Sequence, residues 1–114
     1  MQIKITYDKL IPRLLFDELR DFVKKQGMVT GESVLETYSK PDDSSSFIYR
    51  GTMTFTADEG NDKKGKEGLR ANIVGSDKSE TKLLLDIDEK VFPKEKTDAL
   101  LEDLDFVFSS YKTG

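Results

Sequence analysis

The chain has 114 residues, with 22 acidic and 18 basic side chains, so its formal net charge at pH 7 is −4. It contains no histidine, which excludes histidine-based catalytic triads and histidine-ligated zinc, and no cysteine, which excludes disulfides and thiol chemistry. A chain of this length builds one hydrophobic core, so we predict a single domain over residues 1–114.

The distribution of apolar residues bears on location. No apolar run exceeds three residues, so we expect no membrane contact, and the N-terminus lacks the basic, then apolar, then small-residue order of a signal peptide. A cysteine-free chain suits a reducing compartment, and the cytoplasm is the predicted location.

The N-terminal part predicts a strand, a helix and a second strand. Residues 1–7 alternate apolar and polar side chains, which is typical of a half-buried strand. Pro12 begins a helical segment and Gly27 ends it, and its apolar face carries Leu15, Leu19, Phe22 and Val23. Residues 28–39 favour a strand, and the proline, aspartates and serines of 40–46 favour a turn or loop.

The rest of the chain predicts three more strands and a final helix. Residues 47–56 alternate strictly, whereas 58–67 are mostly charged and are expected to form a solvated hairpin loop. Residues 69–74 and 82–88 alternate again. Pro93 opens a helix whose apolar face is expected to carry Leu100, Leu101, Leu104, Val107, Phe108 and Tyr111.

The predicted order is therefore βαββββα. Short connections between successive strands favour antiparallel pairing, and two amphipathic helices can cover one face of such a sheet. We predict an α+β fold, a two-layer sandwich of a mainly antiparallel sheet with both helices on one face.

Two short matches to ligand-binding motifs fail on context. Residues 60–66 have the glycine spacing of a phosphate-binding loop, but Glu67 replaces the magnesium-binding hydroxyl and a strand follows instead of a helix. Counted from Asp58, a calcium loop would need glycine and glutamate where Lys63 and Leu69 stand. We predict no cofactor and no metal site.

The last helix presents an aromatic side chain on its polar side. Phe106 projects away from Leu104 and Val107, among acidic residues of the same face, namely Glu95, Glu102 and Asp103. Such an aromatic can anchor a partner protein while the acids steer a basic surface toward it. The alternative is that Phe106 covers a strand edge, or that the helix ends before it.

A second candidate site lies on the fifth predicted strand. Asp86 and Asp88 are expected on one face, where Arg50 or Arg70 of neighbouring strands could complete a carboxylate–guanidinium cluster. Paired carboxylates can divide the roles of acid and base, or hold a small ligand. The simpler reading is a set of cross-strand ion pairs on a solvated sheet face.

Nucleic-acid binding is the weakest of the alternatives. Arg50, Arg70 and Lys82 are expected on the polar sheet face, but Phe47, Tyr49 and Phe55 are expected on the opposite face, so stacking platforms are missing. The negative net charge also argues against it.

Three function classes follow, in this order. The first is a protein-binding, accessory or regulatory module whose partner carries a basic surface, and the second is a small-ligand binder or carboxylate-dependent enzyme. The third is a nucleic-acid module. Enzyme activity is the less expected outcome because the usual catalytic side chains are absent. Pairing of edge strands, such as residues 1–7, leaves a homodimer open.

Overall fold

The computed structural model describes residues 1–40, 43–58, 64–76 and 78–113. The strands are β1 (Gln2–Asp8), β2 (Met28–Lys40), β3 (Asp43–Asp58), β4 (Lys64–Ser76) and β5 (Glu80–Ile87). The helices are α1 (Pro12–Lys25) and α2 (Lys94–Phe108), and a short 3-10 helix, η1 (Ser109–Tyr111), follows α2. The predicted order βαββββα is confirmed.

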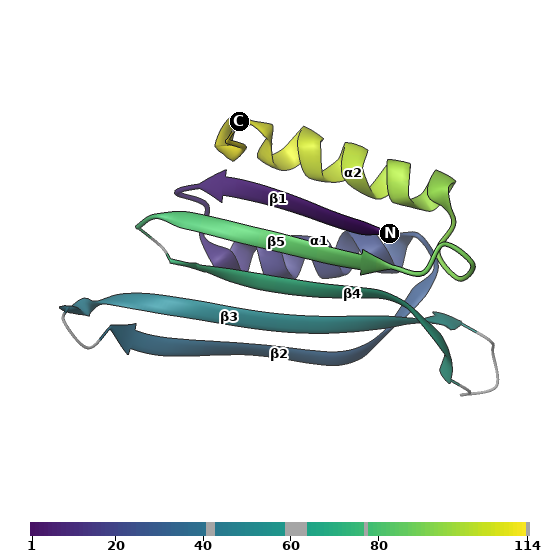
Figure 1. The fold of residues 1–114 in the computed structure, drawn as a ribbon, viewed down its shortest axis with the longest axis horizontal. Coiled ribbons are helices and arrows are strands. Elements are labelled where there is room, and N and C mark those ends of the chain that lie inside the picture. Colours follow the sequence, from purple (N-terminus) through teal and green to yellow (C-terminus); the bar gives the residue numbers. More distant parts are fainter. Residues whose placement is uncertain (41–42, 59–63, 77, 114) are drawn as a thin grey trace.

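The strands form one five-stranded sheet in the order β1-β5-β4-β3-β2, and every neighbouring pair is antiparallel. Figure 1 looks onto the face of this sheet that the helices leave uncovered, with α1 behind the strands and α2 beside β1. We call this side the open face and the side toward the helices the covered face. The predicted two-layer α+β architecture is confirmed.

The core is built from the alternate side chains of each strand that point to the covered face. Ile5, Leu83, Ile73 and Gly51 stand side by side across four strands on the covered face. Gly51 leaves room for the ring of Phe16 from α1, since a Cβ there would lie 2.9 Å from Phe16 Cδ2. The missing side chain on β3 therefore lets α1 approach the sheet closely.

Helix α1 follows its sequence signals closely. Pro12 occupies its first turn, where a proline costs no hydrogen bond, and Leu15, Leu19 and Val23 are fully buried on one face. The chain leaves the helix through Gly27, whose φ of +90° is a conformation that glycine adopts without strain. The helix that the sequence predicts is therefore the helix that packs against the sheet.

Helix α2 is shorter than predicted. It ends at Phe108, and its buried side chains follow a narrow stripe of Thr97, Leu100, Leu104 and Phe108. Val107 remains 42% exposed because it lies beside this stripe, and Tyr111 remains 38% exposed because η1 has replaced the α-helix there. The expected inclusion of these two residues in the apolar face is corrected.

The strands extend further than their hydrophobic patterns. β2 ends at Lys40 and β3 begins at Asp43, so the predicted turn over 40–46 is wrong for Lys40 and for 43–46, and residues 41–42 lie outside the described residues. Likewise, the predicted loop over 58–67 contains the end of β3 and the start of β4, while 59–63 lie outside the described residues. Antiparallel pairing continues these strands through polar sequence, because the hydrogen bonds come from the backbone.

The two edges of the sheet differ. The C-terminal segment partly occupies the outer edge of β1. The Thr113 N–H donates to the carbonyl of Thr6 at 3.0 Å, and Lys112 forms an isolated antiparallel β-bridge with Tyr7. β2 forms the other edge. No helix within the described residues has both the length and the apolar character needed to cross a membrane.

Candidate functional site

The outward side of α2 carries the most exposed large apolar side chain of the described residues. Phe106 is 90% exposed, whereas the next such residue, Ile11, is 53% exposed. Val107 adjoins it and is itself 42% exposed. Phe106 therefore lies outside the core, and it does not cover a strand edge.

The predicted acidic neighbours of Phe106 differ in their availability. Glu102 lies one helical turn before Phe106, is exposed, and forms no salt bridge with a described residue. Asp103 is half-buried, and its Oδ2 lies 3.3 Å from Nζ of Lys25 on α1. Glu95 is eleven residues earlier, which places it about 16 Å away along the helix axis. Only Glu102 flanks Phe106 with a fully available charge.

The electrostatics at the end of α2 are unfavourable for the helix itself. Its last turn has no basic residue, although the carbonyl end of a helix favours cations and disfavours anions. Asp105 lies in that turn and is offset by Lys112, whose Nζ is 3.3 Å from Asp105 Oδ1. The acids near Phe106 thus add to the negative end of the helix dipole.

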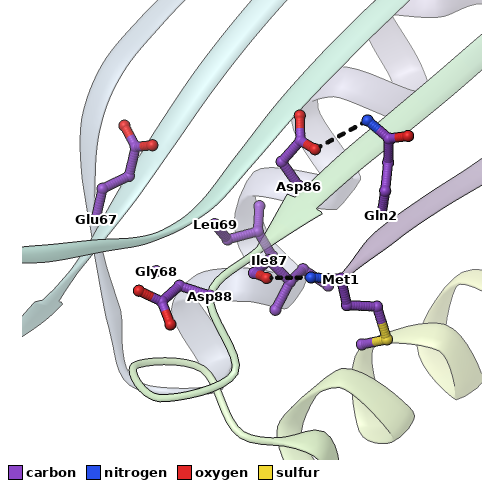
Figure 2. A pocket seen from close by; sticks show the side chains of 8 residues that line it. All are labelled: Met1, Gln2, Glu67, Gly68, Leu69, Asp86, Ile87 and Asp88. Atoms are coloured by element: carbon purple, nitrogen blue, oxygen red, sulfur yellow. Dashed lines mark hydrogen bonds between the residues drawn. The ribbon is translucent and has the colours of Figure 1, made fainter.

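The second predicted site lies where β5 ends beside β1 and β4. A surface hollow of about 410 Å³ lies there, lined by both predicted aspartates together with Glu67 and Met1. Figure 2 shows these side chains. Asp86 Oδ1 accepts a hydrogen bond from Gln2 Nε2 at 3.1 Å, and the Met1 ammonium donates to the carbonyl of Ile87 at 2.8 Å. β5 ends at Ile87, so Asp88 follows the strand instead of sharing its face with Asp86. Both aspartates are exposed to solvent.

Of the two predicted arginines, the structure brings one to this region. Arg70 is paired with Asp86 in the β4–β5 register. Arg50 lies on β3, where it is paired with Glu36 and Val74, and Val74 is paired in turn with Lys82, four residues before Asp86 on β5. Arg50 therefore does not join the predicted cluster.

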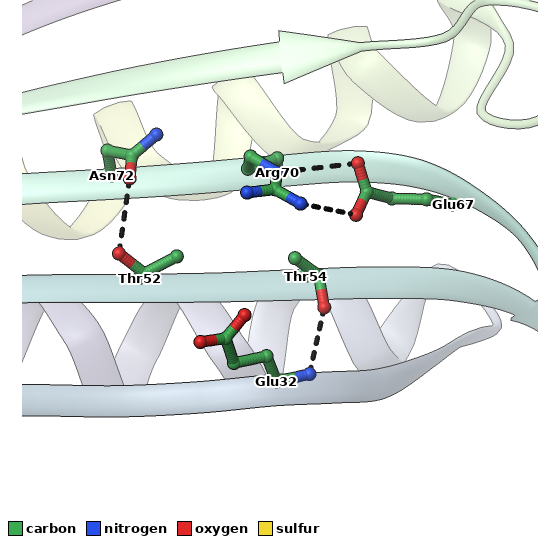
Figure 3. A network of polar contacts seen from close by, with 6 residues as sticks. All are labelled: Glu32, Thr52, Thr54, Glu67, Arg70 and Asn72. Carbon is green, nitrogen blue, oxygen red and sulfur yellow. Dashed lines mark hydrogen bonds and ion pairs between the residues drawn. The ribbon is translucent and has the colours of Figure 1, made fainter.

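The guanidinium of Arg70 is engaged by a partner that sequence reasoning missed. Its Nη2 and Nε lie 3.1 and 3.4 Å from the two carboxylate oxygens of Glu67, as Figure 3 shows. Residues three apart on a regular strand face opposite sides. A β-bulge at Gly68, where Phe55 pairs with Leu69 but Thr56 pairs with Glu67, reverses this and places both side chains on the open face.

This ion pair engages Nε and Nη2 of Arg70 and leaves its other N–H groups to solvent. The hydrogen bonds and charge of Glu67, followed by the charges of Glu32 and Asp86, raise the pKa of Arg70 above its ordinary value. A second bulge lies on β2 between Thr30 and Ser33, and the Glu32 N–H within it donates to Thr54 Oγ1 at 2.8 Å. Figure 3 shows this hydrogen bond. Arg70 is thus the cation of a surface ion network whose carboxylates are those of Glu67, Glu32 and Asp86.

The open face offers little to a nucleic acid. Phe55 is buried and Phe47 and Tyr49 are half-buried on the covered face, as predicted. Tyr38 is the one aromatic residue on the open face of the described strands, and its hydroxyl donates to Glu36 at 2.6 Å, which raises its pKa. A sheet without adjacent aromatic platforms cannot stack successive bases.

No three histidine, cysteine, aspartate or glutamate side chains of the described residues gather closely enough to hold a metal ion. Comparison of the chain with protein-family models, curated proteins and solved structures finds no match. The function must therefore be argued from the surface of the molecule.

Proposed function

We propose that this domain is a protein-binding module that docks through the outward face of α2, with Phe106 as its anchor. The observation that carries the proposal is the 90% exposure of the Phe106 side chain. Aromatic side chains are enriched among the residues that dominate binding energy at protein interfaces.

Folding gives no reason for a phenylalanine at this position. Burial of a phenylalanine side chain contributes roughly 1.5–3 kcal/mol, and Phe106 gains almost none of it within the domain. Phenylalanine is also a weaker helix former than the alanine, leucine, lysine or glutamate that an exposed helical position accepts. A partner that buries the ring would recover the hydrophobic contribution.

The charges around Phe106 indicate the chemistry of that partner. Glu102 is exposed beside the ring, and the carbonyl end of α2 adds a partial negative charge. We infer a partner with an apolar recess that accepts the ring and a basic rim that faces Glu102. Complementary charges of this kind raise the rate of association more than the final affinity.

Capture from a lysate of the native host tests the proposal. The immobilised wild-type domain should retain a protein that the Phe106→Asp variant does not retain, and retention should weaken at high salt. Leu14→Asp is the matched control, because Leu14 is a 44% exposed apolar residue on the other helix. Both variants are first shown to fold by circular dichroism.

Each outcome has a clear meaning. A protein retained by wild type and Leu14→Asp but lost in Phe106→Asp supports the proposal. Equal retention by all three, or loss in both variants, would contradict a role for Phe106. An exchange of Glu102 for lysine should slow association with the captured protein without disturbing the fold, since this side chain is exposed.

A further inference from the structure

The open face contains an apolar hollow near the β1 margin of the sheet. It has a volume of about 350 Å³ and lies over β1, β5 and β4. Leu84 and Val74 supply its apolar surface, and its polar lining comes from Gln2, Lys4, Asn72 and Lys82. We call it the Leu84 hollow. Its size is at the lower end of that of small-molecule sites.

Strand pairing places two lysines beside the apolar surface. Lys4 is directly opposite Leu84 on β1, and Lys82 is two residues before Leu84 on the same face of β5. Asn72 is opposite Leu84 on β4, and Val74 is opposite Lys82. The two ammonium groups therefore flank one apolar patch from adjacent strands, within reach of a single small anion.

Three polar side chains of the Leu84 hollow, Lys4, Lys82 and Asn72, are left as donors. Neither Lys4 nor Lys82 has a carboxylate oxygen within 4.0 Å among the described residues. The acceptor oxygen of Asn72 is occupied by Thr52 Oγ1 at 3.2 Å, as Figure 3 shows, which leaves its amide N–H groups to donate. Asp86, the next residue along this face of β5, already accepts a hydrogen bond from Gln2.

We propose that the Leu84 hollow binds a small organic acid with an apolar body. The carboxylate lies between the ammonium groups of Lys4 and Lys82, where charge-assisted hydrogen bonds form. The apolar body covers Leu84 and Val74, of which Val74 is 42% exposed in the unliganded domain. A cation would meet two like charges there, and an anion without an apolar body would leave the patch in water.

The Leu84 hollow is on the open face, whereas the buried side chains of α2, Leu100, Leu104 and Phe108, belong to the core on the covered face. Ligand binding in the Leu84 hollow therefore does not depend on the proposed protein-binding function, and the two are tested separately.

Octanoate, titrated at constant ionic strength into the isotope-labelled domain, is the test. We expect saturable shifts of the amide signals of Val74, Lys82 and Leu84. Acetate, which has the charge without the body, and octylamine, which has the body with the opposite charge, should each bind at least about tenfold more weakly.

Charge removal at the two lysines provides the decisive comparison. Exposed ion pairs of this kind each contribute up to about fivefold in affinity, so Lys4→Gln with Lys82→Gln should weaken octanoate binding several-fold, by up to about 25-fold. The control carries Lys24→Gln and Lys94→Gln, which remove the same charge from the helices and should bind as wild type does. Equal weakening in the control, octylamine binding as tight as octanoate, or saturable shifts confined to other residues would overturn the proposal.

Discussion

Replacement of Tyr7 by phenylalanine probes a hydroxyl that the core leaves unsatisfied. Tyr7 is 1% exposed, its ring meets Phe108 edge-on at a centroid distance of 5.9 Å, and its Oη has no hydrogen-bond partner among the described residues. A buried hydroxyl without a partner costs about 1–3 kcal/mol. Because Tyr7→Phe removes only this atom, it should raise the free energy of unfolding at pH 7 by roughly 1 kcal/mol.

The same substitution should also change how the free energy of unfolding depends on pH above about pH 9. Burial, with a smaller contribution from the charge of Asp105, raises the pKa of Tyr7 from 10.0 to about 12. The unfolded chain therefore loses this proton first, so the stability present below pH 10 is lost progressively as the pH rises toward 12. At pH 11 the loss attributable to Tyr7 is about 1.4 kcal/mol, and the phenylalanine variant lacks it.

Urea unfolding followed by circular dichroism at pH 7, 9 and 11 measures both effects. The advantage of Tyr7→Phe over wild type should grow by about 1.4 kcal/mol between pH 9 and pH 11. Tyr111→Phe is the control, since Tyr111 is 38% exposed and loss of its hydroxyl should change stability at pH 7 by less than about 0.5 kcal/mol. A variant less stable than wild type at pH 7, or a constant difference across the pH range, would refute the reasoning.

Three further predictions concern the stability of the fold. Gly75→Ala should destabilise the fold by roughly 1–3 kcal/mol in urea unfolding, because the new Cβ would lie 2.7 Å from the backbone Cα of Thr81; unchanged stability would mean that β4 and β5 can separate there. A double-mutant cycle on Lys25 and Asp103 should give a coupling below about 1 kcal/mol, since the pair is partly exposed, and a larger value would mean a more desolvated contact. Phe106→Ala should change thermal stability by no more than about 0.5 kcal/mol, whereas a large loss would place the ring in the core.

The element order could be predicted because local signals and tertiary packing agree. In α1 the proline start, the apolar stripe and the stop at Gly27 all specify one helix, and the structure has that helix. The exposure of Phe106 could also be inferred, because its angular position on α2 opposes Leu104.

Features that depend on long-range pairing could not be predicted. The ion pair of Glu67 with Arg70 requires the bulge at Gly68, and nothing in the alternation of residues 69–74 indicates one. The placement of Lys4 opposite Leu84 requires β1 to pair with β5, a contact across almost the whole chain. The lengths of β3 and β4 were underestimated because hydrophobic alternation ends before backbone pairing does.

The central claim is that Phe106 lies at the interface with a partner protein. A photo-crosslinking phenylalanine analogue placed at position 106 in the native host tests it most directly, with the same analogue at position 14 as the control. The account predicts one covalent adduct at position 106, absent at position 14, that forms more slowly when Glu102→Lys is added. Adducts of equal yield at both positions, or none at position 106, would contradict the claim.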